Sequence, residues 1–357
     1  MVGNLPNGQD QMSQPQEQHL PDDVTHQSAR PTMRCIEYAE AGGTEVIEVV
    51  DRPIPEPGPG EVLVKVAAAG INRADVLQRQ GHYPPPEGAS DIPGLEVSGT
   101  VEELGAGVDG WEFGTPVCAL LAGGGYAEYV SVPAGQLAPV PDGVSVEQAA
   151  ALPEVAATCW SNLMMRAHVE EGEWVLVHGG TGGIGSFALQ LLAAVGARPL
   201  TTAGGERKVE LSRSLGAEEA FDHRSEDFVE RVHEVTGGHG ADVILDVMGG
   251  KYLEPNVKAL APGGRLVVIG LQGGQKGELA IGRLMGKGAW VTGSTLRSQP
   301  ARQKAEIMRQ VVEHVWPLVE AGTIRPQVDR TFSLAEAAAA HEHLETADRT
   351  GKVLLVP

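Results

Sequence analysis

Residues 174–190 read WVLVHGGTGGIGSFALQ and place a glycine-rich turn between two apolar segments. The first segment, WVLVH, is typical of a buried strand, and SFALQLLAAVG after the turn has the spacing of an amphipathic helix. Residues 180–185 fit G-x-G-x-x-G, which between a strand and a helix is typical of a loop that binds the pyrophosphate of a dinucleotide. A turn that only joins the strand to the helix is the alternative.

The glycines of this turn have distinct expected roles. Gly180 would make the tight turn, Gly182 would let the pyrophosphate approach the backbone, and Gly185 would let the helix pack on the strand. The helix N-terminus offers free N–H groups to the phosphates. We therefore predict cofactor contacts along the whole turn, from Gly180, Thr181, Gly182, Gly183, Ile184 and Gly185.

The pattern of predicted strands and helices changes near residue 155. Residues 156–300 alternate apolar runs such as ADVILDVMGG with helix-length stretches, which predicts a Rossmann domain with a doubly wound parallel sheet. Residues 33–155 contain short β-rich runs punctuated by Gly and Pro, which indicate a compact, mostly antiparallel domain. We assign residues 301–357, a long helical pattern interrupted near Pro317 and a final strand, to this second domain. The fold class is α/β.

Composition excludes several classes of protein. The formal net charge of −20 would repel a nucleic-acid backbone, and no apolar run is long enough for a spanning helix. Three scattered cysteines suit a reducing interior, so we expect a cytoplasmic protein with no membrane association. Residues 1–32 are polar and are expected to form a disordered tail; Met33 is an alternative start.

The cofactor preference is expected to depend on the end of the next strand, where an enzyme that prefers NAD places an acid for the ribose hydroxyls. Gly204 stands at that position, and Arg207 and Lys208 follow within a turn of helix. Without the anion and with two cations, the segment favours the 2′-phosphate of NADPH. Glu206 either caps the helix or retains some NAD binding, and the two cations alternatively form a solvated face.

Several motifs together resemble one known family. They are NRADVLQRQGHYPPP (72–86), IPGLEVSGTVEELG (92–105), ALPEVAATCW (151–160) and the glycine-turn segment. Residues 33–357 resemble the medium-chain dehydrogenase/reductase superfamily and, within it, the zinc-free quinone oxidoreductase (zeta-crystallin-like) family. The closest likeness is to the tumour-suppressor-inducible branch. The resemblance implies a GroES-like catalytic domain, a Rossmann domain, and a homodimer joined through the edge strand near WVTGSTL.

Zinc-dependent relatives in the superfamily supply a Cys, a His and a third ligand to a catalytic metal. By the quoted motifs these positions are occupied here by Asn72, by Leu95 and by a residue near Glu154. An amide and an isobutyl group make no useful zinc site, and one carboxylate cannot build a three-ligand site. We therefore expect no metal.

Without a metal, hydride transfer needs hydrogen-bond donors that meet the charge developing on the acceptor oxygen. Tyr83 and Asn72 are the best donors in the loop, so we predict that they orient an acceptor carbonyl over the nicotinamide. Quinones and enones suit such a site because they accept hydride into a conjugated system. The alternatives are a packing role for Tyr83 beside three prolines and a turn-capping role for Asn72.

The resemblance also implies further cofactor contacts. His223 stands where the family commonly has a Tyr that covers the 2′-phosphate. The other implied contacts are Thr158, the loop residues Gly270 and Leu271, and the pair Leu296 and Arg297.

We therefore predict a zinc-independent, NADPH-dependent reductase of quinones or related conjugated carbonyls. An enoyl-thioester reductase is the enzymatic alternative. An NADPH-binding regulatory or crystallin-like protein without turnover is the non-enzymatic one.

Overall fold

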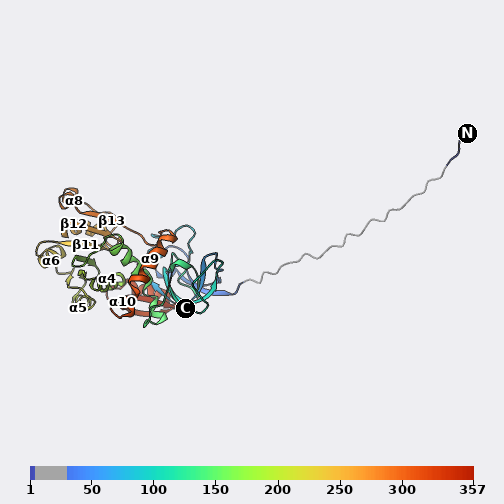
Figure 1. The fold of residues 1–357 in the computed structure, drawn as a ribbon, viewed down its shortest axis with the longest axis horizontal. Coiled ribbons are helices and arrows are strands. Elements are labelled where there is room, and N and C mark those ends of the chain that lie inside the picture. The colour runs from blue at the N-terminus through green and yellow to red at the C-terminus, as the bar shows by residue number, and fades with distance from the viewer. Residues whose placement is uncertain (5–29) are drawn as a thin grey trace. The chain divides into compact units, whose positions relative to one another are not determined.

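The computed structural model describes residues 1–4 and 30–357, so the predicted tail lies largely outside the described residues. Two large β-sheets, one mostly antiparallel and one parallel, and a two-stranded pair organise residues 31–357 (Figure 1). The predicted α/β class, with a GroES-like part and a Rossmann part, is confirmed.

A seven-stranded sheet carries the GroES-like part. Its order is β14-β15-β3-β4-β5-β7, and β6 pairs with β3 outside this order. A separate pair joins β1 and β2 in antiparallel fashion. The strands are β1 (Thr32–Tyr38), β2 (Ile47–Pro53), β3 (Glu61–Ile71), β4 (Glu96–Leu104), β5 (Pro116–Leu120), β6 (Tyr129–Pro133), β7 (Leu137–Pro139), β14 (Val328–Ser333) and β15 (Lys352–Val356).

The central strand β3 sets the position of the site. It pairs with β15, β4 and β6, and most of its apolar side chains are buried in the core of this part of the molecule. The last strand of the chain, β15, runs antiparallel to β3 with Val353 opposite Ile71. The C-terminal residues therefore lie directly beside the start of the NRAD segment.

The Rossmann part is a six-stranded sheet with the order β10-β9-β8-β11-β12-β13, and every pairing in it is parallel. The chain leaves the first strand, β8, toward one edge and later returns to its other side at β11. A ligand crevice is expected at such a reversal. The strands are β8 (Trp174–His178), β9 (Arg198–Ala203), β10 (Glu219–Asp222), β11 (Ala241–Asp246), β12 (Leu260–Val268) and β13 (Trp290–Gly293).

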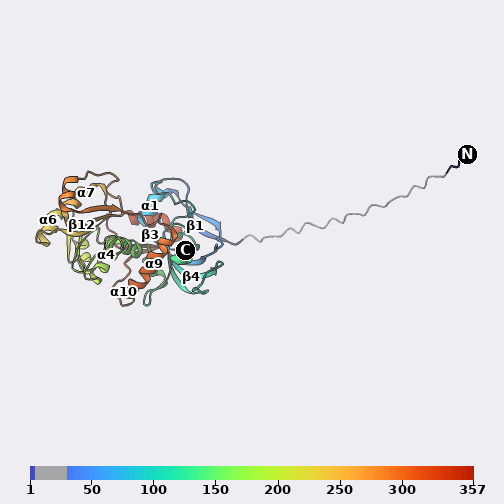
Figure 2. The ribbon, with the colours of Figure 1, turned by 45° about the horizontal axis from the view of Figure 1, so that its top comes forward.

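Helices cover the parallel sheet and join the two parts. α9 lies between the two sheets in both views, and the predicted interruption near Pro317 is confirmed, since a new helix starts there (Figures 1 and 2). The helices are α1 (Arg73–Arg79), α2 (Val146–Ala149), α3 (Pro153–Cys159), α4 (Gly183–Ala194), α5 (Glu206–Ser214), α6 (Phe228–Val235), α7 (Leu253–Ala259), α8 (Ile281–Lys287), α9 (Ala301–His314), α10 (Trp316–Glu320) and α11 (Ala337–Glu345). Short turns complete the fold: 3₁₀ turns at Thr44–Val46, Ala134–Gln136, Gly250–Tyr252 and Leu334–Glu336, and a π-helical turn at Trp160–Met164.

Candidate active site

A cavity of about 580 Å³ lies where the glycine turn faces the C-terminal segment. Residues of both parts of the molecule line it: the turn and the ends of β8 and β9 from one, and Ile71–Arg73 and the segment 344–352 from the other. The predicted site residues among the lining are Asn72, Thr181, Gly182, Gly183, Ile184, Gly185, Gly204, Lys208 and His223. The cavity thus brings together most of the predicted phosphate-binding residues.

The glycine turn has the close packing that a pyrophosphate loop requires. A Cβ at Gly185 would lie 2.1 Å from the carbonyl oxygen of Gly179, so only glycine lets α4 approach the turn this closely. At Gly182 the nearest atom to such a Cβ is 3.5 Å away, which leaves the backbone open to a ligand. The left-handed residue of the turn is Gly179, with φ +80°, one position before the predicted Gly180. Gly180 instead packs against Thr201, whose hydroxyl would be 2.4 Å from a Cβ there.

The far end of the cavity is cationic around Gly204. A Cβ at Gly204 would lie 3.1 Å from His223 Nε2 and 3.3 Å from Arg224 Nη2, so these two side chains occupy the space beside the bare glycine. Lys208 and Arg224 also line the cavity. Sequence reasoning missed Arg224, although its position directly after His223 could have revealed it. An anionic group at this end of the cavity would lie near the cations Lys208 and Arg224, and no acidic side chain stands at position 204 to repel it.

The C-terminal segment holds the two predicted cations. Lys208 Nζ donates to the carbonyl oxygens of Ala347 and Arg349, both at 2.8 Å, and Arg207 Nη2 donates to that of Asp348 at 2.7 Å. Because an ammonium has three donors, one N–H of Lys208 remains for a ligand. Burial and the neighbouring cations Arg349 and Arg207 lower the pKa of Lys208. Arg207 is directed toward the C-terminal segment and does not line the cavity.

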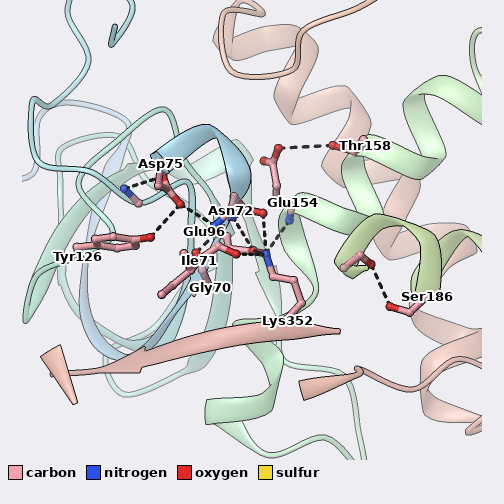
Figure 3. A network of polar contacts seen from close by, with 12 residues as sticks. Gly70, Ile71, Asn72, Asp75, Glu96, Tyr126, Glu154, Thr158, Ser186 and Lys352 are labelled. Carbon is pink, nitrogen blue, oxygen red and sulfur yellow. Dashed lines mark hydrogen bonds and ion pairs between the residues drawn. The ribbon is translucent and has the colours of Figure 1, made fainter. Parts of the chain in front are cut away.

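A buried polar network lies at the end of the cavity lined by Ile71, Asn72 and Lys352 (Figure 3). Lys352, at the start of β15, places its Nζ 2.5 Å from Glu96 Oε1, 2.6 Å from Asn72 Oδ1 and 3.0 Å from the carbonyl oxygen of Ile71. Lys352 is 4% exposed and Glu96 is fully buried. All three ammonium hydrogens therefore have acceptors, which is the condition under which a buried ion pair is tolerated.

The same network engages the side chain of Asn72. Its Nδ2 donates to Glu96 Oε1 at 2.9 Å and to the carbonyl oxygen of Gly70 at 3.3 Å, while its Oδ1 accepts from Lys352. Its backbone N–H donates to Asp75 Oδ2 at 2.7 Å, which closes a capping box at the start of α1. Asp75 is held in turn by the hydroxyl of Tyr126 at 2.9 Å.

The positions that bind zinc in metal-dependent relatives do not fit a metal here. Asn72 has its carbonyl oxygen bonded to the Lys352 ammonium, and Leu95 offers no ligand atom. No group of three or more His, Cys, Asp or Glu side chains suited to a metal ion occurs within residues 1–4 and 30–357. The positive charge that pairs with Glu96 is the ammonium of Lys352.

Glu154, Thr158 and Tyr83 lie beyond the residues that line the cavity. Thr158 Oγ1 contacts Glu154 Oε1 at 3.5 Å (Figure 3). Burial, and then the neighbouring Glu96, raise the pKa of Glu154 to about 8. Burial also raises the pKa of Tyr83, while Arg297, whose guanidinium carbon is 5.5 Å from the Tyr83 ring centroid, acts in the opposite direction.

The remaining predicted contacts are placed away from the cavity lining. Gly270 packs on the carbonyl oxygen of Val247, at 2.7 Å from a Cβ built there, and Leu271 is 51% exposed. Gln272, the next residue, lines the cavity and was missed. Leu296 packs against the apolar core, and Arg297 contacts the Tyr83 loop. Gln272 follows the two predicted positions by one and two residues. The periodicity of the sequence cannot predict which residue of a loop faces a cavity.

Comparison with known proteins gives two matching family models. Residues 58–142 match the alcohol dehydrogenase GroES-like domain, and residues 183–314 match the zinc-binding dehydrogenase model. The chain is 35% identical to a quinone oxidoreductase of Pseudomonas aeruginosa over 325 residues, which cover 90% of this chain and 99% of the relative. It superimposes on an Escherichia coli quinone oxidoreductase complexed with NADPH with a TM-score of 0.82 and 31% identity, covering 91% of this chain and all of the other.

A further relative is a much larger protein. The chain is 33% identical over 302 residues to a mycocerosic acid synthase-like polyketide synthase of Mycobacterium tuberculosis, and the match covers 84% of this chain but 14% of that synthase.

The fold and the matching family models define an oxidoreductase of the medium-chain dehydrogenase/reductase superfamily. Within this superfamily, the chain belongs to the quinone oxidoreductase-like family. Among residues 1–4 and 30–357, no helix has the length and apolar character needed to cross a bilayer.

Proposed function

We propose that the protein is a zinc-independent reductase that uses NADPH to reduce quinones or related conjugated carbonyls. The observation that carries the cofactor preference is the far end of the cavity, which the cations Lys208 and Arg224 line together with Gly204 and the imidazole of His223. A 2′-phosphate would be stabilised there by charge-assisted hydrogen bonds. An adenosine ribose that lacks the phosphate would leave these cations without an anionic partner.

The glycine turn would hold the rest of the dinucleotide. The first N–H groups of α4 have no partner within the helix, and its first residues, Gly183, Ile184 and Gly185, line the cavity. We assign the nicotinamide to the opposite end, near Asn72, and propose that it also reaches the predicted contacts Thr158, Gly270, Leu271 and Leu296, which lie outside the lining of the cavity. When bound, the reduced nicotinamide supplies a hydride to the acceptor.

The protein's own contribution would be to orient the acceptor carbonyl. We propose that the Tyr83 hydroxyl donates a hydrogen bond to the acceptor oxygen and supplies the proton that it takes up. The Asn72 side chain is already bonded to Glu96, Gly70 and Lys352, so we propose that it contributes by fixing the wall of the site. Zinc independence is supported by the poor fit of the residues at the metal positions.

An assay of NADPH oxidation against quinones, enones and enoyl-CoA thioesters, with and without prior EDTA treatment, tests this proposal. We expect turnover of quinones or enones that EDTA leaves unchanged and that Tyr83→Phe reduces about a hundredfold, the typical effect of losing one transition-state donor. Activity that EDTA abolishes and zinc restores would contradict the proposal.

An enoyl-thioester reductase is the second candidate. The similarity to one segment of a polyketide synthase favours it specifically, because the synthesis of a polyketide proceeds through acyl thioesters. Faster turnover of enoyl-CoA than of every quinone and small enone in the same panel would select this function. NADPH binding without turnover of any of them would instead favour a regulatory or crystallin-like role.

We also propose a homodimer in the cytoplasm, closest to the tumour-suppressor-inducible branch of the family. The edge strand β13 and the helix before it expose apolar side chains near one another in sequence: Ile281 (57%), Met285 (75%) and Trp290 (38%). An exposed apolar edge suits pairing with a second copy. Light scattering after size-exclusion chromatography should give twice the mass of 37.5 kDa, and Trp290→Lys should halve it.

A further inference from the structure

Four Lys or Arg side chains are buried among the described residues, and they fall into two kinds. Arg79 and Lys352 each form an ion pair with a carboxylate. Arg297 and Lys304 are each 4% exposed, yet within the described part of the chain neither has an ion pair with a carboxylate. A buried charge without an opposite charge costs several kcal/mol unless other interactions compensate.

The hydrogen bonds of these two cations all go to neutral oxygens. The Arg297 guanidinium donates to the carbonyl oxygen of Ala122 at 2.8 Å, to that of Tyr83 at 3.2 Å and to Gln78 Oε1 at 2.7 Å. Lys304 Nζ donates to the carbonyl oxygen of Arg297 at 3.3 Å. The guanidinium therefore joins three segments, at Gln78, Tyr83 and Ala122, and the Lys304 ammonium contacts the backbone of Arg297.

Two buried carboxyl groups act on these cations from a distance: Asp75 and Glu154 on Arg297, and Glu154 on Lys304. Neither forms an ion pair with them, and Arg297 lies beside Tyr83, to whose backbone it donates. The charge of the two cations is thus not balanced by a direct partner among the residues that the structure describes. Proteins retain such an unfavourable arrangement mainly at functional sites.

We propose that the positive charges of Arg297 and Lys304 lie beneath the acceptor pocket. They stabilise the negative charge that develops on the acceptor oxygen during reduction. This inference rests on the proposed function. Hydride addition transfers two electrons and one hydrogen to the conjugated acceptor, whose carbonyl oxygen becomes an enolate or hydroquinone monoanion. The Tyr83 hydroxyl then gives that oxygen its proton and regains one from water. Arg297 also acts as a positioning residue, since it holds the Tyr83 backbone.

Lys304→Met separates this role from a structural one. Methionine has a similar length and no charge, so removal of the unpaired ammonium should leave the melting temperature unchanged or raise it. The kcat should fall about tenfold or more, because transition-state stabilisation is lost, while KM changes little. Arg302→Met, an exposed position on the same helix, is the matched control and should alter neither quantity.

Two substitutions, one that keeps the positive charge and one that removes it, test the role of Arg297. Arg297→Lys should keep more of the kcat than Arg297→Met, because it preserves the positive charge but not the three hydrogen bonds. A second readout does not need turnover: in the presence of NADP⁺, 4-nitrophenol should bind as its phenolate at a pH below that needed in free solution. Lys304→Met should remove this shift.

The outcomes distinguish a failure of this inference from a failure of the proposed function on which it rests. If the wild type reduces no quinone, enone or enoyl thioester, the proposed function fails, and the phenolate measurement still decides whether the site stabilises an anion. If the wild type turns over and Lys304→Met melts earlier with unchanged kcat, the ammonium is structural and the inference is overturned. A rise in KM confined to acidic substrates would overturn it as well, in favour of a subsite for a substrate anion.

Discussion

The ammonium of Lys352 lies 2.5 Å from the carboxylate of Glu96, and both groups are almost completely buried beside Asn72. Removing one partner of such a pair leaves the other as an isolated buried charge. We expect Lys352→Met to lower the free energy of unfolding by about 3–5 kcal/mol, measured by urea denaturation. The double variant Lys352→Met/Glu96→Gln should recover much of this loss. If the double variant lost as much stability as Lys352→Met and Glu96→Gln together, the two residues would not be energetically coupled.

The proposed phosphate-binding end of the cavity leads to a testable change in cofactor preference. Lys208→Met and Arg224→Met should each weaken NADPH binding by about tenfold to a hundredfold, the typical range for one charge-assisted hydrogen bond. NADH binding should change little, because it lacks the phosphate. Titration calorimetry with both nucleotides measures the effect, and Arg213→Met, an exposed position on the same helix, is the control. An equal loss for NADH and NADPH would contradict the assignment.

Gly204→Asp should shift the preference toward NADH. The Cβ of the new side chain would lie 3.1–3.3 Å from the side chains of His223 and Arg224, so its carboxylate could pair with them and repel a phosphate. Gly204 is not among the glycines with positive φ, so backbone strain should be small. The ratio of kcat/KM for NADPH to that for NADH should fall at least tenfold. Gly204→Ala, which adds bulk without charge, should shift this ratio less.

The sequence predicted the parts of the site that depend on local pattern. The glycine turn follows a buried strand, and Gly204, Lys208 and His223 all lie within a few residues of strand ends, where parallel strands present their side chains to one crevice. The exact residue of a turn is less predictable. Gly179 rather than Gly180 takes the left-handed conformation, and Gln272 rather than Leu271 lines the cavity.

Contacts between distant segments could not be predicted. Lys352 reaches Asn72 across 280 positions of sequence, and the carbonyls that hold Lys208 come from residues 347–349. No periodicity links such positions, because the contacts depend on how β15 pairs with β3 and on how the C-terminal segment crosses the glycine turn. Asn72 shows the consequence: its sequence suggested a free donor, whereas its amide belongs to an internal network.

Glu154 should make stability depend on pH. Its folded pKa of about 8 lies above the usual value near 4.5, so the folded state binds more protons than the unfolded state between those values. Stability from this group is therefore present at low pH and is lost as the pH rises from about 5 to 8. The slope is at most about 1.4 kcal/mol per pH unit. Glu154→Gln should flatten the curve of unfolding free energy against pH in this window; identical slopes would show that the carboxyl is ionised throughout.

Gly351 connects the C-terminal segment to the glycine turn, and a pair of alanine variants can measure that connection. Its N–H donates to the carbonyl oxygen of Thr181 at 2.7 Å, its φ is +70°, and a Cβ there would lie 2.3 Å from the carbonyl oxygen of Gln327. Gly263 has a similar φ of +75° but nothing within 4 Å of such a Cβ. Gly263→Ala should therefore cost only the backbone strain, about 1–2 kcal/mol in urea denaturation.

Gly351→Ala adds a backbone clash to the same strain and should cost clearly more than Gly263→Ala. Because the displaced segment also carries the carbonyls that hold Lys208, the variant should bind NADPH several-fold more weakly in titration calorimetry, whereas Gly263→Ala should bind it normally. Equal unfolding free energies and equal affinities in the two variants would show that the C-terminal segment yields without disturbing the turn. The difference between the variants thus isolates the close approach of Gly351 to its neighbours from the cost of a left-handed alanine.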